Sequence, residues 1–396
     1  MIWRILKWFF CMVPELKSKI AIIGAGPAGC ICAYYLQKHY EVTLFDFSSP
    51  LRTLLPTGGG RCNLAYAEYD FKELAKNYPR GEKFLYSAFS RFSTWDTIAF
   101  FDEIGISTYM QDDMRIFPVS NSSKDVRDKF LGALNEVKFK REKVLRVERC
   151  NYLFRVITEQ NTYNTDGIVI STGGHASYNI IKYLGHKIVP PVPSLVGLKT
   201  EENNSQLAGV SLKNVSARFE NKNLTGDLLF THEGVSGPLV YKISSLMARK
   251  GFPYEIHFDF TGDISLQNIL NDNPHKSIKN ILSEFVPKSL AIFILNMLNI
   301  SEEEKAHKID GKTRDRILSV LNDFKVKVVS TAKDGEVVTS GGVDLNEVNP
   351  KTMESKIEAG VYFCGEVLDV DGFCGGFNLQ NCWSTGYTAA QGIIQA

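Results

Sequence analysis

The chain has 396 residues, of which 44% are hydrophobic and 22% charged, and its 45 lysines and arginines almost balance its 44 aspartates and glutamates. This length favours two or three domains, each large enough to bury a core. The net charge of +1 argues against a nucleic-acid-binding protein, which usually carries excess basic charge, and against an acidic disordered chain. We therefore expect no nucleic-acid partner.

The eight cysteines and seven histidines are scattered and match no zinc or disulfide spacing. We predict no metal site. The low cysteine content is typical of a reducing compartment and predicts a cytoplasmic location.

Residues 1–18 form a predicted N-terminal extension. Residues 1–13 are apolar apart from Arg4 and Lys7, but they are too few to span a bilayer and lack a signal-peptide cleavage site. One interpretation is an anchor at the membrane surface, and the other is a frayed segment upstream of a true start at Met12. We expect no stable membrane insertion.

The first half of the chain predicts a β-α-β unit followed by helices and then by strands. The predicted strands cover 20–23 and 41–45, and a buried strand that ends in a glycine turn covers 167–174. Residues 138–163 have a β-like pattern. The predicted helices cover 30–37, 70–76, 82–89, 93–104 and 124–134.

In the second half, the proline-rich segment 189–194 is predicted to interrupt both helix and β-ladder, and so to mark a domain boundary. Residues 195–262 predict short strands and one helix, with Pro238 in its first turn and Ser236 as a candidate cap. Residues 264–324 predict helices, and β-structure returns after Lys325 with a further buried strand at 360–364.

Gly24, Gly26 and Gly29 stand in the spacing GxGxxG, with Pro27 and Ala28 between the last two. In a strand–turn–helix context these glycines allow a tight turn, a close approach to a pyrophosphate, and close packing of helix on strand. Asp46 ends the second strand about twenty residues later, where a carboxylate can accept from ribose hydroxyls. The pattern predicts dinucleotide binding rather than a simple tight turn.

A second glycine-rich segment, residues 57–63, favours FAD over NAD. Three glycines up to Gly60 let backbone lie against a flat ring system, and Arg61 and Asn63 supply hydrogen-bond donors; the alternative is a flexible loop. Cys62 has no partner in the CxxxxC spacing of flavin disulfide reductases. It is therefore either a packing residue or a single reactive thiol.

Three other short segments are assigned to the cofactor site. The glycine turn after the buried strand contains Thr172 and Gly173. Near the C-terminus, Glu366 after Gly365 can hold ribityl hydroxyls. Gly376, Phe377 and Asn378 begin a helix whose N-terminus can stabilise an anionic reduced flavin.

The sequence resembles the HI0933-like flavoproteins, a family of aminoacetone oxidase-type or NAD(P)/FAD-dependent oxidoreductases. The motifs that carry the resemblance include GAGPAG at 24–29, GGGRCN at 58–63, MRIFPVS at 114–120, FTHEGVSGP at 230–238 and FCGEVLDVDGFCGGFNLQ at 363–380. It implies an α/β fold with a discontinuous, Rossmann-like FAD-binding domain, 19–190 and 335–396. It further implies an inserted β-barrel-like domain, 191–263 and 325–334, and a small helical subdomain, 264–324.

The resemblance also implies FAD contacts at the three fingerprint glycines, Asp46, 60–63, 365–366 and 376–378, and a backbone contact of Val144 with the adenine. Three side chains are weak catalytic candidates. Arg115 would bind a substrate carboxylate or carbonyl, or form a structural ion pair. His232 would donate a proton or occupy a turn, and Cys62 is the third.

We therefore predict an FAD-dependent oxidoreductase that passes a hydride through flavin N5 to or from a small-molecule substrate. One activity implied by the resemblance is reduction of a C=C bond or enone, with NAD(P)H as a candidate donor. The other is oxygen-dependent oxidation of an amine of the aminoacetone type. A third hypothesis is a flavin-bound protein that associates with RNA or another partner. The oligomeric state stays open.

Overall fold

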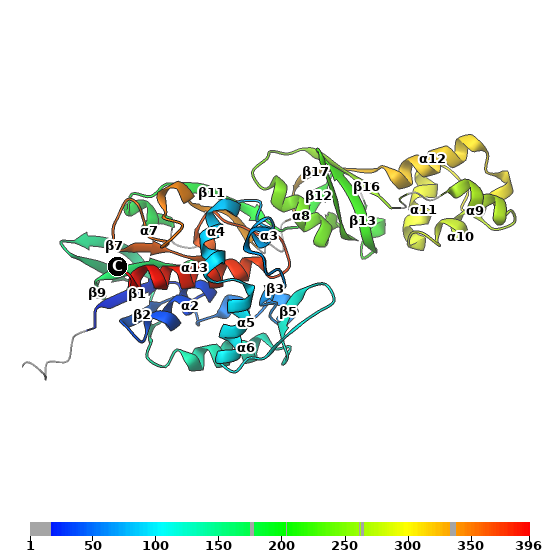
Figure 1. Cartoon of the computed structure of the whole chain (residues 1–396). Helices are drawn as coiled ribbons and strands as arrows, with labels where there is room; N and C mark the ends of the chain where they lie inside the picture. The colour runs from blue at the N-terminus through cyan, green and yellow to red at the C-terminus, as the bar shows by residue number, and fades with distance from the viewer. Residues whose placement is uncertain (1–16, 175–177, 203, 261, 263–264, 333–337) are drawn as a thin grey trace, which may run out of the picture. The chain divides into compact units, whose positions relative to one another are not determined.

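The structure, a computed structural model, describes residues 17–174, 178–202, 204–260, 262, 265–332 and 338–396. The predicted N-terminal extension lies outside the described residues except for Lys17 and Ser18. The chain divides into two compact units (Figure 1). Unit 1 consists of the residues up to Pro191 and Gly341–Ala396, and unit 2 of Val192–Ser340.

The centre of unit 1 is a parallel sheet with strand order β19-β10-β1-β2-β6. Its strands are β1 (Lys19–Ile23), β2 (Glu41–Phe45), β6 (Lys138–Lys140), β10 (Gly167–Ile170) and β19 (Val361–Phe363). Strands β10 and β19 are buried throughout, as is typical of parallel strands covered on both faces. The predicted β-α-β unit and both predicted buried strands are confirmed.

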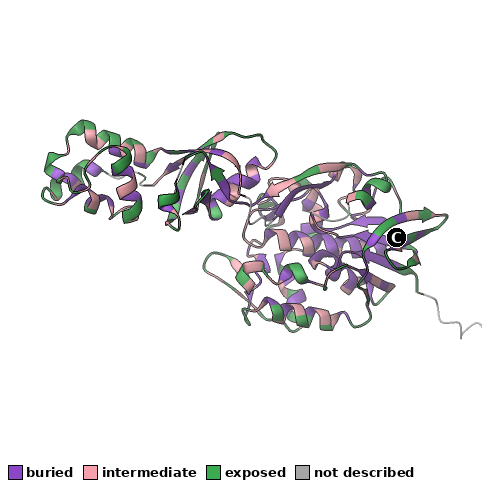
Figure 2. Ribbon diagram, turned by 180° about the vertical axis from the view of Figure 1, so that it is seen from behind, coloured by how far each residue is buried: buried purple, intermediate pink, exposed green. Residues whose placement is uncertain are grey.

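Two helices pack together beside this sheet, α2 (Pro27–Leu36) and α13 (Phe377–Ile394). They approach closely because Gly386 has no side chain: a Cβ there would lie 2.5 Å from the carbonyl oxygen of Ala28. Figure 2 shows the buried residues of unit 1 gathered in the sheet and in this C-terminal helix. The core of unit 1 thus lies around the two helices that flank the glycine motifs.

Four further helices of unit 1 confirm the predicted helices: α3 (Phe71–Ala75), α4 (Glu82–Arg91), α5 (Thr94–Glu103) and α6 (Ser123–Ala133). A fifth helix, α7 (Tyr178–Tyr183), was not predicted. Capping explains where they begin. The Ser122 hydroxyl accepts from the Asp125 N–H at 3.2 Å, and Ser93 and Asp96 form a capping box at the start of α5.

Two small antiparallel sheets and several short 3₁₀ turns complete unit 1. The sheets are β3 (Ala65–Tyr66), β5 (Arg115–Pro118) and β4 (Thr108–Met110), and β7 (Val144–Cys150), β8 (Leu153–Thr158) and β9 (Thr162–Thr165). The turns are η1 (Arg52–Leu54), η2 (Thr57–Gly60), η5 (Leu345–Glu347) and η6 (Gly365–Val367).

Unit 2 contains a closed β-barrel with strand order β12-β15-β14-β13-β16-β17. The strands are β12 (Leu198–Thr200), β13 (Ser211–Phe219), β14 (Lys222–Phe230), β15 (Gly234–Ser236), β16 (Tyr254–Asp259) and β17 (Phe324–Thr331). Buried and exposed residues alternate along β13, because one face of each strand points into the barrel. With the parallel sheet of unit 1, this barrel confirms the predicted fold class.

The helices of unit 2 are α8 (Pro238–Met247), α9 (Leu266–Asp272), α10 (Ile278–Leu282), α11 (Lys288–Met297) and α12 (Gly311–Asn322), with the turns η3 (Ser205–Leu207) and η4 (Ala306–Lys308). The helical character predicted for 264–324 is confirmed. The prediction that Ser236 caps α8 was wrong. Gly237 occupies that position without a side-chain cap, and the Ser236 hydroxyl, at the end of β15, donates to the Tyr241 hydroxyl at 3.2 Å.

The proline-rich segment does not interrupt the ladder as predicted. It forms β11 (Ile188–Ser194), which pairs with β18 (Val338–Val343) in a two-stranded sheet. Each strand of such a sheet has one unpaired edge, so a proline without an N–H is tolerated there. The chain leaves unit 1 after Pro191 and returns at Gly341.

Candidate cofactor-binding site

Two glycines of the GxGxxG motif, Gly24 and Gly29, are required for the packing of the protein backbone. Gly24 has a φ of 106°, and a Cβ there would lie 2.4 Å from the carbonyl oxygen of Ser171. A Cβ on Gly29 would lie 2.1 Å from the carbonyl oxygen of Gly24. Both contacts are closer than real side chains permit, so these glycines allow β1, α2 and the end of β10 to meet.

Gly26 differs, because the only atom near a Cβ there is Thr53 Oγ1 at 3.9 Å. Its φ of −77° is open to any residue, and it precedes α2 without a side-chain cap. The first N–H groups of a helix carry partial positive charge and attract anions. Gly26 therefore leaves room at a helix N-terminus that suits a phosphate.

Asp46 follows β2 and is tied to the same turn. One carboxylate oxygen accepts from the Ala25 N–H at 2.9 Å, and the other accepts from the N–H and hydroxyl of Ser48 at 2.7 and 2.8 Å. A carboxylate has about four lone-pair sites, so Asp46 can also accept from a ribose. The network holds it beside the glycine turn.

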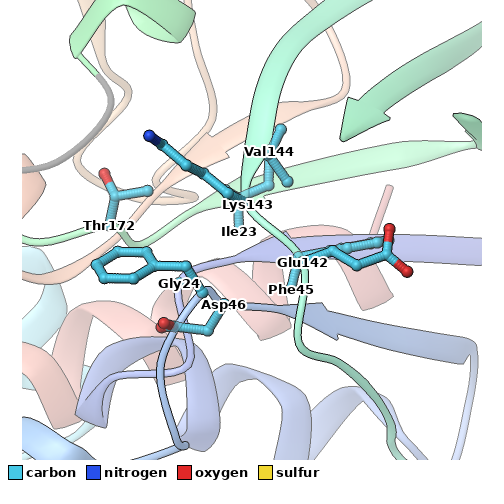
Figure 3. Close-up of a pocket in the computed structure, with 9 residues that line it drawn as sticks. Ile23, Gly24, Phe45, Asp46, Glu142, Lys143, Val144 and Thr172 are labelled. Atoms are coloured by element: carbon cyan, nitrogen blue, oxygen red, sulfur yellow. The ribbon is translucent and has the colours of Figure 1, made fainter. Parts of the chain in front are cut away.

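A pocket opens at the carboxyl ends of β1, β2 and β10, beside the start of β7 (Figure 3). Open α/β sheets bind ligands at this edge. The pocket brings together four residues assigned from the sequence, Gly24, Asp46, Val144 and Thr172. The Thr172 hydroxyl is buried and forms no hydrogen bond with any residue that the structure describes, so a polar group beside the pocket is left unused.

Five further lining residues were not assigned from the sequence: Ile23 and Phe45, which end predicted strands, and Phe47, Glu142 and Lys143. Phe47 is 61% exposed and directly follows Asp46, so an aromatic residue after the acid was the available signal. Glu142 accepts from the hydroxyls of Thr158 and Tyr163 at 2.6 and 2.7 Å. Burial raises the pKa of Glu142, but these hydrogen bonds outweigh it and the net pKa is lowered.

The second glycine-rich segment, 57–63, forms η2 and the turn after it. Gly59 and Gly60 have positive φ angles of 68° and 85°, and no atom lies within 4 Å of a Cβ at either position. The Arg61 guanidinium stacks on the Phe117 ring at 4.3 Å. Asn63 is 9% exposed, and its buried Oδ1 accepts no hydrogen bond from the described part of the chain. The segment thus presents bare backbone and an unused amide oxygen, which suits a flat polar ring.

Cys62 lies within this segment but has the properties of a packing residue. Its side chain is fully buried, and burial raises the pKa of its thiol to about 12. The thiol is therefore protonated at neutral pH and is a poor nucleophile.

The C-terminal segments approach the start of α2 and the strand β3. A Cβ on Gly365 would lie 2.6 Å from the Ala28 Cβ, and one on Gly376 would lie 2.6 Å from the carbonyl carbon of Ala65. The rings of Phe377 and Tyr66 are 4.8 Å apart. These contacts bring the fingerprint, the 57–66 region and the start of α13 to one place in unit 1.

The polar groups of these C-terminal segments have partners in the protein. Asn378 makes two hydrogen bonds of 2.9 Å with the backbone of Gly372, and the Gly365 N–H donates to the Thr385 hydroxyl at 2.9 Å. Asn378 therefore shapes the turn before α13, a role that the sequence did not reveal. Gly173 has a φ of 74° with open space around it.

The remaining catalytic candidates belong to different units. Arg115, on β5, binds Asp113 through its Nε at 2.7 Å and holds the pKa of that carboxyl below its usual value. The structural ion pair is thus the interpretation of Arg115 that the geometry favours. His232 is exposed in the turn between β14 and β15 of unit 2.

Two further features are absent from the residues that the structure describes. No group of three or more histidine, cysteine, aspartate and glutamate residues is placed to hold a metal ion within those ranges. No helix in the same ranges is both long and apolar enough to cross a bilayer.

Comparison with known proteins places the chain among flavoproteins. The family model described as HI0933-like protein Rossmann domain matches residues 18–392. The ribosomal RNA dihydrouridine synthase of Escherichia coli (strain K12) is 31% identical over 95% of this chain and 98% of that protein. The 3-dehydro-bile acid delta(4,6)-reductase of Clostridium scindens is 27% identical over 96% of this chain and 99% of that protein.

A solved structure supports the fold alone. The open conformation of a flavocytochrome c3 fumarate reductase aligns with a TM-score of 0.51 at 12% sequence identity, covering 100% of this chain and 81% of that chain.

Proposed function

This chain belongs to the HI0933-like family of flavoproteins and is an FAD-dependent oxidoreductase, and we propose that it reduces a C=C bond conjugated to a carbonyl group. One observation carries the proposal. Two relatives that span almost the whole chain are named for a uridine-reducing and an enone-reducing activity. Uridine, like a 3-oxo steroid with a neighbouring double bond, contains a C=C bond conjugated to a carbonyl, so one chemistry serves both.

The residues of unit 1 fit FAD. The open space above Gly26 suits the pyrophosphate, and Asp46 suits the adenosine ribose. The unpaired Thr172 hydroxyl and Asn63 amide oxygen are buried polar groups that need a partner, and a buried group without one costs about 1–3 kcal/mol. Bound FAD would supply hydride acceptance and donation, chemistry that belongs to the cofactor.

The chain itself would bind and orient the substrate beside that cofactor. Bare backbone at Gly59 and Gly60 allows close approach of a flat ring. The Arg61 guanidinium lies over the Phe117 ring at 4.3 Å and gives this part of unit 1 positive charge, whereas the charge of Arg115 is paired with that of Asp113. An electronegative carbonyl would be stabilised there as negative charge develops on it.

For the substrate we propose uridine in ribosomal RNA, because the relative named for that reaction is 31% identical over 95% of the chain. A small cyclic enone is the second candidate. The bile acid reductase favours it, as does the net charge of +1, which gives no general attraction to RNA phosphates.

We propose NAD(P)H as the reductant. The sequence contains one GxGxxG fingerprint in a strand–helix context, so the nicotinamide would dock directly at the flavin. A cytoplasmic location fits this donor and also fits the seven described cysteines, none of which forms a disulfide within the described residues.

Product analysis tests the proposal. The FAD-loaded protein is incubated without oxygen with NADH or NADPH and either a ribosomal RNA transcript or 2-cyclohexenone. We expect dihydrouridine in digests of the RNA by mass spectrometry, and consumption of the enone if small substrates are also accepted. Loss of enone with unchanged RNA would reassign the substrate to small molecules, and no reduced product from either would overturn the proposal.

A further inference from the structure

The near-neutral charge of the whole chain conceals one strongly basic segment. Residues 138–155 run from β6 through β7 into β8 and contain two acidic side chains, Glu142 and Glu148, and seven basic ones. The basic residues are Lys138, Lys140, Arg141, Lys143, Arg146, Arg149 and Arg155. The segment therefore has a net charge of +5, whereas the chain as a whole has a net charge of +1.

Glu142 does not neutralise the exposed cations beside it in the sequence, because its side chain is buried. It is 8% exposed, and its carboxylate accepts hydrogen bonds from two hydroxyl groups of unit 1. Figure 3 shows the Glu142 carboxylate and the Lys143 ammonium pointing in opposite directions. Lys143 lies 4.0 Å from the Glu159 carboxylate. Arg141 is exposed and forms no ion pair with any residue that the structure describes.

Two arginines on the outer face of the β7–β8 ladder share one carboxylate. Arg155 lies opposite Glu148 in the antiparallel register. The Glu148 carboxylate is 2.8 Å from Arg146 and 4.0 Å from Arg155, and the two arginine side chains remain 51% and 45% exposed. Val147 and Val156 point to the opposite face and are buried. One positive charge is therefore left without a counter-charge on the outer face.

Four of these residues make up what we call the basic surface: Arg141, Lys143, Arg146 and Arg155. The two other cations of this hairpin and of β6 that bind carboxylates of distant segments are not part of it. Lys138 binds Glu41 at 2.7 Å, and Arg149 lies 3.5 Å from Glu358. The basic surface follows one hairpin and the connection that leads into it, at the edge of unit 1 where Figure 1 labels β7 and β9.

We infer that the basic surface binds the phosphate backbone of the RNA substrate, an inference that rests on the proposed reduction of uridine in ribosomal RNA. Contacts of arginine and lysine with phosphates supply affinity and fix the position of the RNA without reading its sequence. Charge beyond about 10 Å is largely screened at 0.1 M ionic strength, so the local excess of positive charge matters more than the net charge of the chain.

The hairpin also carries a group that suits unpaired bases. Tyr152, in the turn between β7 and β8, is 91% exposed, and an exposed aromatic ring is a surface on which a base of single-stranded RNA can stack. An anionic membrane surface has the same charge as RNA. The relative named for a reaction of ribosomal RNA favours RNA as the partner.

The test compares two triple variants of the FAD-loaded full chain. Arg141→Gln, Arg146→Gln and Arg155→Gln together remove three charges from the basic surface and leave Lys143, which lines the cofactor pocket, in place. The control combines Lys288→Gln, Lys308→Gln and Lys312→Gln, which remove three exposed charges from unit 2. Retention of FAD and the melting temperature should be unchanged in both variants.

Affinity for a ribosomal RNA transcript is measured by fluorescence anisotropy at several salt concentrations, without a reductant. Each lost phosphate contact lowers the slope of log affinity against log salt by about 0.7–0.9. We expect the arginine variant to lose about 2–3 from this slope and to bind about tenfold or more weakly at low salt. The lysine variant should bind as the unsubstituted protein does.

Unchanged RNA affinity in the arginine variant, equal losses in both variants, or no RNA binding by the unsubstituted protein would each overturn the inference. Vesicles of phosphatidylserine and phosphatidylcholine provide a further comparison, since arginine-dependent binding to vesicles but not to RNA would reassign the basic surface to a membrane. Dihydrouridine is measured separately. Arginine-dependent RNA binding without dihydrouridine formation would support the basic surface and overturn the proposed reduction of RNA.

Discussion

Gly24 and Gly29 face protein atoms, whereas Gly26 and Gly59 face empty space. A Cβ on either of the first two would overlap backbone oxygen, so those glycines serve the fold. The other two leave surface bare for a ligand. Separate alanine substitutions can therefore distinguish stability from cofactor binding within one motif.

Gly29→Ala should destabilise unit 1 and prevent FAD retention. Its Cβ would lie 2.1 Å from the Gly24 carbonyl oxygen, and overpacking of this kind costs about 1–3 kcal/mol. Thermal melting and the ratio of flavin to protein absorbance check this. The control is Gly132→Ala on α6, where no atom lies within 4 Å and a gain of about 0.5–1 kcal/mol is expected. Equal melting temperatures for the two variants would contradict the prediction.

Gly26→Ala should weaken FAD binding without lowering the stability of unit 1. Its backbone accepts alanine and the nearest atom to the new Cβ is 3.9 Å away, so the FAD-free protein should melt as the unsubstituted protein does. The methyl group would occupy the space proposed for the pyrophosphate and weaken FAD binding about tenfold or more. Titration of the FAD-free protein with FAD measures this, and unchanged affinity would remove Gly26 from the cofactor site.

His186 should make stability depend on pH. Burial lowers its pKa, although Glu347, at 3.1 Å from Nδ1, partly opposes this. Since the unfolded chain binds the proton more readily, stability is full above about pH 6.5 and declines as the pH falls below that value. His186→Gln should flatten this part of the profile in urea unfolding at several pH values. A slope that survives the substitution would assign the effect to other groups.

At the scale of elements, a buried ion pair joins two segments that are distant in sequence. Arg80, before α4, binds Asp371, before α13, through both carboxylate oxygens. The Asp371 side chain is fully buried and that of Arg80 is 15% exposed. The pair therefore holds the turn that leads into α13 against the turn that leads into α4.

Asp371→Asn should cost about 3 kcal/mol or more, because it leaves a largely buried guanidinium without its counter-charge. Asp128→Asn, in the exposed pair with Arg127, is the matched control and should change stability by less than about 1 kcal/mol. Chemical denaturation compares the two. Similar small losses would show that the Arg80–Asp371 pair does not fix these turns.

Many of the helices and strands could be predicted from the sequence, because the signals that determine them are local. Hydrophobic runs define β1 and β10, and Ser122 caps α6 by a hydrogen bond three residues away. The proline-rich strand β11 was missed because its tolerance of proline depends on a partner, β18, far along the chain. Phe47 and Asn378 were harder to assign for the same reason: their surroundings come from distant segments.

At the scale of the whole molecule, the two units have separate hydrophobic cores. One core surrounds β1, α2 and α13, and the other fills the barrel and the helices α9–α12. The chain crosses between them at neighbouring points, since a Cβ on Gly341 would lie 2.6 Å from the Pro191 Cα. Unit 1 thus has a hydrophobic core of its own, as an independently folding domain requires.

Replacing Val192–Ser340 by a short glycine–serine linker should therefore leave a folded protein that retains FAD. We expect cooperative thermal unfolding and a flavin-to-protein ratio close to that of the full chain. The full chain with the same linker inserted after Gly209, in the loop before β13, controls for the added sequence. An unfolded or flavin-free product would show that unit 1 depends on the insertion.

The proposed function requires that the flavin deliver its hydride to a conjugated C=C bond. To test this, the bound FAD is reduced chemically without oxygen and mixed with ribosomal RNA transcript or 2-cyclohexenone, and the flavin absorbance is followed. At least one of these should reoxidise the flavin with formation of the saturated product. A flavin that stays reduced with both, and is reoxidised only when oxygen is admitted, would contradict it and favour the amine oxidase.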